Sequence, residues 1–403
     1  MGNLEPGYYK VRGPASVSLD SCSAEVMGYE CTGNCSFTVP IGRTYSMIIY
    51  ERCSYEISPL EAEVEKDPLG KHLYRVRNEI TGIASEGEFD GLVFIGPPDS
   101  FKSTLSTLVY NSLSKTRKPA YITVDIGQNE IFLPAFVSGT TINPLFPGNR
   151  PGLHHDCFTG VISPPSDIEK YLYCYLRIKK MLELDKHKPI IVDTDGWIEG
   201  LAALYSKMAI AQSFERPLVV YTGLHQLEER ILAYWYPGST VKYSFPAIPG
   251  SKSRSERRIH RQRIVMKAFN DPSRHTVSPD ETSIIGLPVF TGSRVDVSDL
   301  GFKGIIYSEM NSWGKLVLVT GNNVRIPKLR GVERLIQGWE KGLMIALYHK
   351  GTVSGIGLIE RVDYARKKIV FIADRNVKYD LVEVGKTRFP EVLNSLLTSI
   401  SRG

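Results

Sequence analysis

Four short apolar runs in the middle of the chain constrain its fold more than any other feature. They are GLVFIG at 91–96, AYITVD at 120–125, PIIVDT at 189–194 and PLVVYTG at 217–223. Strands with so few polar positions are typical of a parallel sheet that is covered on both faces. Amphipathic helical patterns alternate with these runs, at 102–116, 168–184 and 201–215. The alternation predicts an α/β domain with a doubly wound, mostly parallel sheet over residues 86–285.

The two ends of the chain show a different pattern. Short segments of alternating apolar and polar residues, separated by Gly, Asn and Pro, occupy 1–85 and return in 286–403. This pattern is typical of β-structure, and a short helix is expected after Pro390. A chain of 403 residues is also too long for one ordinary core. We therefore predict three domains, with β-rich domains at 1–85 and 286–403 on either side of the α/β domain.

The composition is that of a globular protein, with 42% hydrophobic and 23% charged residues. No apolar run is long enough to span a bilayer, so no membrane association is expected. Four of the six cysteines lie in the N-terminal segment: Cys22, Cys31, Cys35 and Cys53. Their spacing lacks the Cys-x2-Cys element of common zinc sites, so small half-buried residues in strands are preferred over a zinc site. Sparse cysteines favour a reducing compartment without disulfides, and hence the cytoplasm, or the nucleus or nucleolus in a eukaryote.

The segment GPPDSFKST at 96–104 has the spacing of a phosphate-binding loop, G-x-x-x-x-G-K-[ST], except that Phe101 replaces the second glycine. Such a loop surrounds phosphates with backbone N–H groups at a helix N-terminus, while its lysine reaches the β- and γ-phosphates and its serine binds magnesium. The alternative is a plain strand-to-helix turn. The predicted nucleotide-binding residues are Gly96, Pro97, Pro98, Asp99, Ser100, Phe101, Lys102, Ser103 and Thr104.

Two aspartates compete for the role of the acidic partner of this loop. Asp125 follows one buried run, and Asp193 ends another. Both are expected at the carboxyl edge of the sheet, where ligands of open α/β sheets bind. Either carboxylate could hold a magnesium-bound water or accept a proton from an attacking hydroxyl, and Asp125 could instead be a helix cap.

Two further segments suggest a nucleic-acid substrate. Trp197 lies beside Gly196 in the loop after Asp193, where an indole could stack on a base or pack as a hydrophobic plug. The segment SKSRSERRIHRQRIVMK at 251–267 carries many basic residues and one Glu. In a helix, Arg254, Arg258 and Arg261 would share one face. The segment is either a mobile lid over phosphate groups or a solvated basic face or localisation signal.

With these segments assembled, the chain resembles the polynucleotide 5′-hydroxyl kinase family, which includes a pre-mRNA cleavage-factor kinase subunit, a nucleolar rRNA-processing kinase and archaeal relatives. GPPDSFKST is similar to the family's Walker A loop, and DIGQ at 125–128 to its Walker B variant. TDGW at 194–197 is similar to its clasp, RSERRIHR at 254–261 to its arginine lid, and FTGVISPPSDIEKYL at 158–172 to a further family segment. The archaeal type is the expected member.

The resemblance implies transfer of the ATP γ-phosphate to the 5′-OH end of RNA, with DNA as an alternative acceptor, in RNA processing or repair. It implies ATP and Mg²⁺, with Ser103 and Asp125 at the metal, and it favours Asp125 over Asp193 as the catalytic carboxylate. The implied catalytic residues are Lys102, Asp125, Arg258 and Arg261. The implied substrate-binding residues are Gln128, Thr194, Gly196, Trp197, Arg254 and Arg257.

Two other functions are compatible with the same residues. The chain could be a non-catalytic ATP-binding scaffold of an RNA-processing complex, for which Phe101 is the main argument. It could also be a P-loop enzyme that hydrolyses ATP or GTP, but such an enzyme needs neither the TDGW loop nor a basic lid. An RNA-processing nuclease or ligase is the expected protein partner.

Overall fold

The computed structural model describes residues 2–149, 152, 154–184, 186, 188–236, 238–246, 253–298, 304–322, 324 and 330–402. The chain divides into two compact units, residues 1–260 and 261–403. The first unit holds an N-terminal β-sheet and an α/β sheet, and the second holds two further β-sheets. Among the described residues, no helix is both long and apolar enough to cross a membrane.

The N-terminal sheet has seven strands in the order β1-β6-β3-β5-β2-β7, with β4 paired to β3. Apolar side chains alternate with polar ones along these strands, for example in β3, and the apolar set forms a separate core. The strands are β1 (Gly2–Leu4), β2 (Gly7–Arg12), β3 (Ala15–Val26), β4 (Tyr29–Val39), β5 (Thr44–Ile49), β6 (Cys53–Ser58) and β7 (Val64–Lys66).

The cysteines differ from the expectation of free thiols. All six are paired in the structure, as Cys22–Cys53, Cys31–Cys35 and Cys157–Cys174. The first two disulfides link strands or strand segments of the N-terminal sheet, and the third joins a sheet strand to a helix of the α/β domain. The prediction of a chain without disulfides is therefore wrong. For Cys22 and Cys53, the antiparallel pairing of β3 with β6 brings together two cysteines that are distant in sequence.

The α/β sheet of the first unit has the order β11-β10-β9-β12-β8-β13-β14. The five strands from β9 to β14 in this order run parallel, while β10 and β11 are antiparallel at one edge. The predicted α/β fold with a mostly parallel sheet is confirmed. The strands are β8 (Gly91–Ile95), β9 (Ala120–Thr123), β10 (Phe136–Thr140), β11 (His155–Phe158), β12 (Ile190–Asp193), β13 (Pro217–Thr222) and β14 (Thr240–Tyr243).

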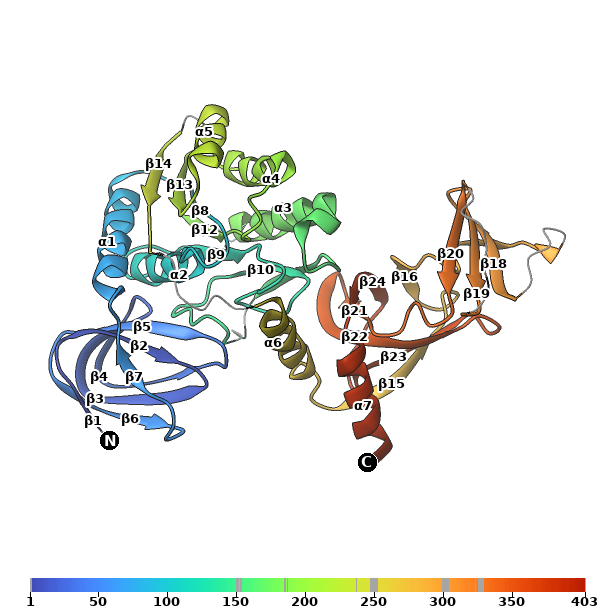
Figure 1. Ribbon diagram of the computed structural model, residues 1–403, viewed down its shortest axis with the longest axis horizontal. Coiled ribbons are helices and arrows are strands. Elements are labelled where there is room, and N and C mark those ends of the chain that lie inside the picture. The colour runs from blue at the N-terminus through green and yellow to red at the C-terminus, as the bar shows by residue number, and fades with distance from the viewer. Residues whose placement is uncertain are drawn as a thin grey trace. The chain divides into compact units, whose positions relative to one another are not determined.

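Helices cover both faces of this sheet (Figure 1). One apolar core contains residues of α1 and α2, and the other contains residues of α3, α4 and α5. The two cores use alternate residues of the same strands, so that Leu92 and Phe94 face one side while Val93 and Ile95 face the other. The helices are α1 (Gly70–Glu86), α2 (Lys102–Leu113), η1 (Pro164–Ser166), α3 (Ile168–Leu184), α4 (Leu201–Gln212), α5 (Gln226–Trp235) and α6 (Arg254–Met266).

Buried polar contacts join the N-terminal sheet to the helix that follows the P-loop segment. Arg77 of α1 forms a buried ion pair with Glu25 of β3 and also donates to the Ser112 hydroxyl of α2. The Asn111 side chain of α2 donates to the Met27 carbonyl at 2.7 Å and to the Leu145 carbonyl at 2.9 Å. Because a buried ion pair or amide is costly to separate from its partners, these contacts hold α2 in a fixed position.

The second unit contains a six-stranded sheet, β15-β23-β22-β21-β24-β16, and a four-stranded sheet, β17-β18-β19-β20. The helix expected after Pro390 is present as α7 (Pro390–Arg402). The first sheet comprises β15 (Pro272–Val277), β16 (Ser283–Ile285), β21 (Leu343–His349), β22 (Thr352–Asp363), β23 (Lys368–Asp374) and β24 (Leu381–Arg388). The second comprises β17 (Gly292–Arg294), β18 (Ile305–Asn311), β19 (Leu316–Thr320) and β20 (Val332–Ile336).

The divisions between these parts differ from the expected boundaries at 85 and 285. Helix α1 packs in the core of the α/β sheet, so the N-terminal sheet ends with β7. Strands β15 and β16 pair with β23 and β24 of the second unit. Segment 272–285 therefore belongs with the C-terminal β-structure, since strand pairing, and not local composition, decides where it lies.

Candidate active site

The GPPDSFKST segment connects β8 to α2, as a phosphate-binding loop does. At Gly96, an added Cβ would lie 2.1 Å from the Thr222 carbonyl oxygen, so only glycine fits there. The Ser100 hydroxyl donates to the Pro97 carbonyl at 2.8 Å and lies 2.9 Å from the Thr222 hydroxyl. The loop is thus held in shape by its own side chains and by the end of β13.

Phe101 adopts the backbone conformation that a glycine would have at this position. Its φ is 66° and its ψ is 11°, which is left-handed, and its carbonyl accepts the N–H of Leu105 at 2.9 Å in the first turn of α2. The ring centroid lies 4.9 Å from that of Phe245, at the edge of the apolar core that contains α1 and α2. The substitution therefore keeps the loop geometry and directs the ring into apolar contacts.

Lys102 is the first residue of α2 and is buried, with 6% of its surface exposed. Its Nζ donates to the Pro97 carbonyl at 2.8 Å, so the side chain folds back over the loop. Burial lowers the pKa of Lys102, while three carboxylates oppose this effect, led by Asp193 and followed by Asp125 and Asp195. Lys102 is the cation around which these acidic groups are arranged.

Asp125 follows β9 and is partly exposed at the carboxyl edge of the sheet. Its Oδ1 accepts the N–H groups of Gly127 at 3.0 Å and Gln128 at 2.9 Å, which closes a tight turn. Desolvation and then the Asp195 charge raise the pKa of Asp125, against the opposing effect of Lys102. One carboxylate oxygen is committed to the turn, and the other has no such structural partner.

Asp193 ends β12, the strand that pairs directly with the P-loop strand β8. It is fully buried, and neither carboxylate oxygen has a hydrogen-bond partner among the described residues. Burial raises the pKa of Asp193 to about 7, although Lys102 and the nearby Ser103 hydroxyl counteract the rise. Asp193 therefore lies on the P-loop side of the sheet edge, one strand closer to β8 than Asp125.

The TDGW loop packs on the P-loop. A Cβ added to Gly196 would lie 2.7 Å from the Pro98 nitrogen, so glycine permits this close approach. The Thr194 hydroxyl donates to the Phe94 carbonyl of β8 at 2.7 Å, which ties the start of the loop to the P-loop strand. Trp197 is half-buried at the end of the segment.

A buried network that the sequence did not predict fixes this loop. The Asp195 Oδ1 accepts the N–H of Trp197 at 2.8 Å, and its Oδ2 accepts the Tyr171 hydroxyl at 2.6 Å. The same carboxylate forms an ion pair with Lys207, whose side chain is completely buried in α4. Lys207 could have indicated a buried ion pair, because it is the one charged residue of the segment LAALYSKMAIAQ. Its partner could not be read from the sequence.

The basic segment forms helix α6. Arg254 and Arg258 are exposed on it, and the guanidinium of Arg257 forms an ion pair with Asp99 of the P-loop at 2.9 Å. Arg261 lies on the same helix but past the end of the first unit. Residues 251 and 252 of the predicted lid lie outside the described residues.

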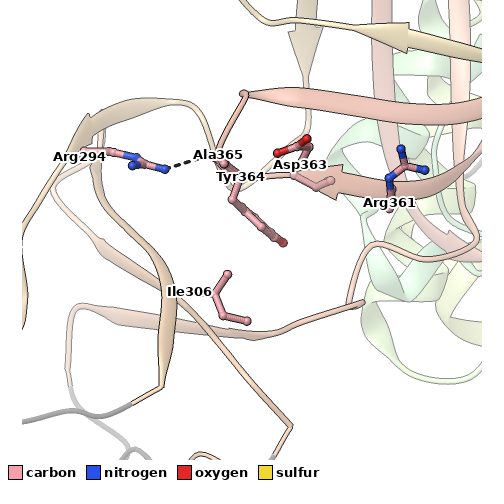
Figure 2. A pocket seen from close by; sticks show the side chains of 7 residues that line it. Arg294, Ile306, Arg361, Asp363, Tyr364 and Ala365 are labelled. Carbon is pink, nitrogen blue, oxygen red and sulfur yellow. Dashed lines mark hydrogen bonds between the residues drawn. The ribbon is translucent and has the colours of Figure 1, made fainter.

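The remaining predicted residues lie on these same elements. Ser103 and Thr104 are half-buried in the first turn of α2, and Gln128 is half-buried in the turn after Asp125. A separate cavity of about 530 Å³ belongs to the second unit and is lined by Arg294, Arg361, Tyr364 and others (Figure 2). Arg294 already donates to the Tyr364 carbonyl there, at 2.9 Å. None of the predicted site residues lines that cavity.

The segment that carries these residues is similar to known proteins. Residues 96–271 match the family model described as the P-loop of the mRNA cleavage and polyadenylation factor CLP1. This part of the chain is similar to the P-loop domain of the CLP1 family. The family match covers the P-loop, both aspartates, the TDGW loop and the whole of α6.

Two curated relatives and one solved structure extend the comparison. The polyribonucleotide 5′-hydroxyl-kinase Clp1 of Xenopus tropicalis is 24% identical over 282 residues, which cover 64% of this chain and 63% of that protein. A polyribonucleotide 5′-hydroxyl-kinase of Pyrococcus furiosus is 25% identical over 297 residues, covering 69% and 81%. The chain thus spans somewhat less than two thirds of the frog relative.

The fold similarity is broader than the sequence similarity. The Clp1p structure from a complex of wild-type Clp1p with Pcf11p has a TM-score of 0.62, at 15% identity, and the match covers 96% of this chain and 97% of that one. At this identity the match establishes the fold alone. It extends the likeness beyond the P-loop domain to the β-rich segments at both ends.

Proposed function

We propose that this chain is an ATP-dependent polynucleotide 5′-hydroxyl kinase that acts on RNA ends. The observation that carries the proposal is the grouping of Lys102, Asp125 and Asp193 at the carboxyl edge of adjacent parallel strands. Open α/β sheets bind their ligands at this edge. The names of the frog and archaeal relatives support the choice of a 5′-hydroxyl acceptor.

The loop residues 96–104 bind the phosphates of ATP in this proposal. Backbone N–H groups at the start of α2 face the phosphate oxygens, and the helix dipole adds a favourable field. Lys102 exchanges its bond to the Pro97 carbonyl for the β- and γ-phosphates. Thr104, one residue further on α2, contacts the α-phosphate.

A magnesium ion fits this site, although the protein alone does not enclose one. Among the described residues there is no cluster of three or more His, Cys, Asp or Glu that could hold a metal. A nucleotide-bound magnesium needs only one or two protein ligands, because phosphates and waters supply the rest. Ser103 and a carboxylate at the sheet edge supply those ligands. The oxygens of Asp193 support this, because neither accepts a hydrogen bond from the residues that the structure describes. The bound ion would neutralise charge on the phosphates.

Asp125 orients the 5′-hydroxyl of the acceptor and accepts its proton. Its turn with Gly127 and Gln128 fixes the side chain and leaves one oxygen for the substrate. A weak acid such as a hydroxyl is deprotonated late in a loose transition state, so the base mainly positions the nucleophile. Gln128 lies in the same turn, where it can meet the acceptor end.

The acceptor strand binds along the TDGW loop and the lid. Trp197 stacks on a terminal base, which allows recognition without sequence preference. Thr194 and Gly196 place the indole by tying the loop to β8 and to Pro98. Arg254 and Arg257 contact backbone phosphates, and Arg258 and Arg261 stabilise the charge on the transferred phosphoryl group.

Transfer of label from γ-labelled ATP, followed by thin-layer chromatography, tests the proposal. We expect label on an RNA with a 5′-OH end and none on the same RNA with a 5′-phosphate. Release of free phosphate that does not depend on RNA would indicate a hydrolase, and ATP binding without either product would indicate a scaffold. A 5′-OH DNA of the same sequence shows which acceptor is preferred.

A protein partner belongs to the proposal as well. The structural neighbour was solved as a complex of Clp1p with Pcf11p, so that protein assembles with another chain. We expect this chain to act together with an RNA-processing nuclease or ligase, since a kinase that supplies 5′-phosphates prepares ends for ligation. Co-purification of such an enzyme with the tagged full chain from its native source tests this part separately.

A further inference from the structure

Asp193 is a buried carboxylate that the fold itself does not use. It is 0% exposed, and none of the described residues donates a hydrogen bond of ordinary geometry to either oxygen. A buried charge without hydrogen bonds costs several kcal/mol, so such a group needs an explanation outside the protein's own contacts. A ligand that binds at the group supplies one.

The neighbours of Asp193 show which ligand it faces. Lys102 is the strongest opposite charge acting on Asp193, and the Ser103 hydroxyl lies beside its carboxylate. Both residues open α2 directly after the phosphate-binding loop. Asp193 therefore faces the hydroxyl that is expected to bind the nucleotide's magnesium.

The strand order separates the two aspartates. Strand β12 pairs with β8 on one side and with β9 on the other, in parallel. Asp193 is level with Phe94 of the P-loop strand, whereas Asp125 follows β9, one strand further away. Neighbouring strands lie about 4.8 Å apart, and Asp125 also lies beyond Thr123, the residue that is level with Asp193. Asp125 is therefore further from the P-loop strand than Asp193 in both directions.

Asp125 is also less suited to the metal because of its own contacts. Its Oδ1 already accepts two backbone N–H groups. These bonds hold the carboxylate in the turn and leave its other oxygen for a different partner. Neither oxygen of Asp193 accepts a hydrogen bond of ordinary geometry within the described part of the chain.

We propose that Asp193 is the carboxylate that binds the magnesium of the bound nucleotide, directly or through a water, and that Asp125 serves the acceptor hydroxyl alone. The inference rests on the nucleotide site of the proposed function, and it replaces the assignment of Asp125 to the metal. It also gives a role to the residue for which the family resemblance offered none.

Calorimetric titration with the non-hydrolysable analogue β,γ-imido-ATP, in EDTA and in magnesium, tests the inference on the full chain. The ratio of the two dissociation constants measures how strongly the metal couples to nucleotide binding. We expect magnesium to strengthen binding about tenfold or more in the wild type and in Asp125→Asn. In Asp193→Asn, whose side chain has nearly the same size, this gain should fall to about threefold or less.

The EDTA measurement is the internal control. Removing the Asp193 charge should leave metal-free binding equal or tighter, because one negative charge near the phosphates is lost. If Asp193→Asn is insoluble, Asp193→Ser repeats the test with another small polar side chain. An unchanged magnesium effect in the Asp193 variants, or its loss in Asp125→Asn instead, would overturn the inference.

The outcome is separable from that of the proposed function. Magnesium-coupled nucleotide binding that depends on Asp193, without transfer to RNA, would refute the kinase proposal and leave the metal assignment standing. Transfer to RNA with a magnesium effect that does not depend on Asp193 would do the reverse. A wild type whose nucleotide affinity is the same in EDTA and magnesium would also refute the metal assignment.

Discussion

Replacing Phe101 by alanine and by glycine should separate two opposing effects at the P-loop. The native residue has φ 66°, a conformation that costs a residue with a Cβ about 1–2 kcal/mol. Its ring is partly buried and lies 4.9 Å from the ring of Phe245, a contact that stabilises the fold. Alanine loses the ring contact and keeps the backbone cost, whereas glycine loses both.

The magnitudes follow from these contacts. Truncating a fully buried Phe to Ala costs about 3–5 kcal/mol, and a half-buried ring should cost about half of that. Phe101→Ala is therefore expected to lower the free energy of unfolding by ~2 kcal/mol. Phe101→Gly should recover ~1 kcal/mol of this loss, because glycine adopts a positive φ without strain. Glycine is thus expected to be more stable than alanine at the start of a helix.

Chemical denaturation of the three proteins measures the order, and Phe245→Ala is the matched control. It removes the same ring contact at a residue outside the loop, so it should destabilise the protein without altering nucleotide affinity. An alanine variant more stable than the glycine variant would contradict the left-handed conformation at residue 101. Binding of ATP by Phe101→Gly, together with no binding at millimolar ATP in the wild type, would show that the loop is disabled and would refute the kinase proposal.

The other predictions concern the chemistry and its support. Lys102→Ala and Asp125→Asn should each reduce label transfer to RNA by more than about tenfold, or 1.4 kcal/mol of barrier, with unchanged circular dichroism. Arg258→Ala should lower kcat by about tenfold or more, as a contact made in the transition state does, and a change in RNA affinity alone would make α6 a docking surface. Lys207→Met should destabilise the protein by about 3–5 kcal/mol because it leaves the Asp195 charge buried and unpaired. Adding Asp195→Asn to Lys207→Met should restore part of that stability in denaturation, and equal losses in both proteins would show that the ion pair is not the cause.

The α/β domain was predictable because its strands are short, apolar and separated by helices. GLVFIG and PIIVDT can hardly form anything but buried strands, and their alternation with amphipathic helices leaves few other topologies. The ends of the chain were less predictable. The sequence pattern of segment 272–285 is similar to that of the strands on either side of it. Only its pairing with β23 and β24 assigns it to the second unit. The disulfides were missed for the same reason, since register and not spacing brings Cys22 to Cys53.

The site residues likewise differ in whether local sequence or long-range packing determines their position. Asp125 and Asp193 could be placed from the sequence because they lie at the ends of buried strands, and parallel strands align their carboxyl ends. Lys102 could be placed because its loop follows a buried strand and it opens the next helix. The network of Asp195 could not, because its partners lie on α3 and α4 and are brought in by helix packing. Lys207 is recognisable in the sequence as a lysine within an apolar helix. Its structural role, however, depends on which carboxylate lies beside it in the fold.

The ion pair of Lys207 with Asp195 has a functional consequence for the TDGW loop. Asp195 accepts the backbone N–H of Trp197 while its other oxygen is held by Tyr171 and Lys207, so the position of the indole depends on two residues that need not touch the substrate. A loop fixed in this way loses little entropy when a base stacks on it. If Lys207 acts by positioning Trp197, Lys207→Met should raise the KM for RNA and leave the KM for ATP nearly unchanged. A merely structural role would reduce the amount of active protein and move neither constant.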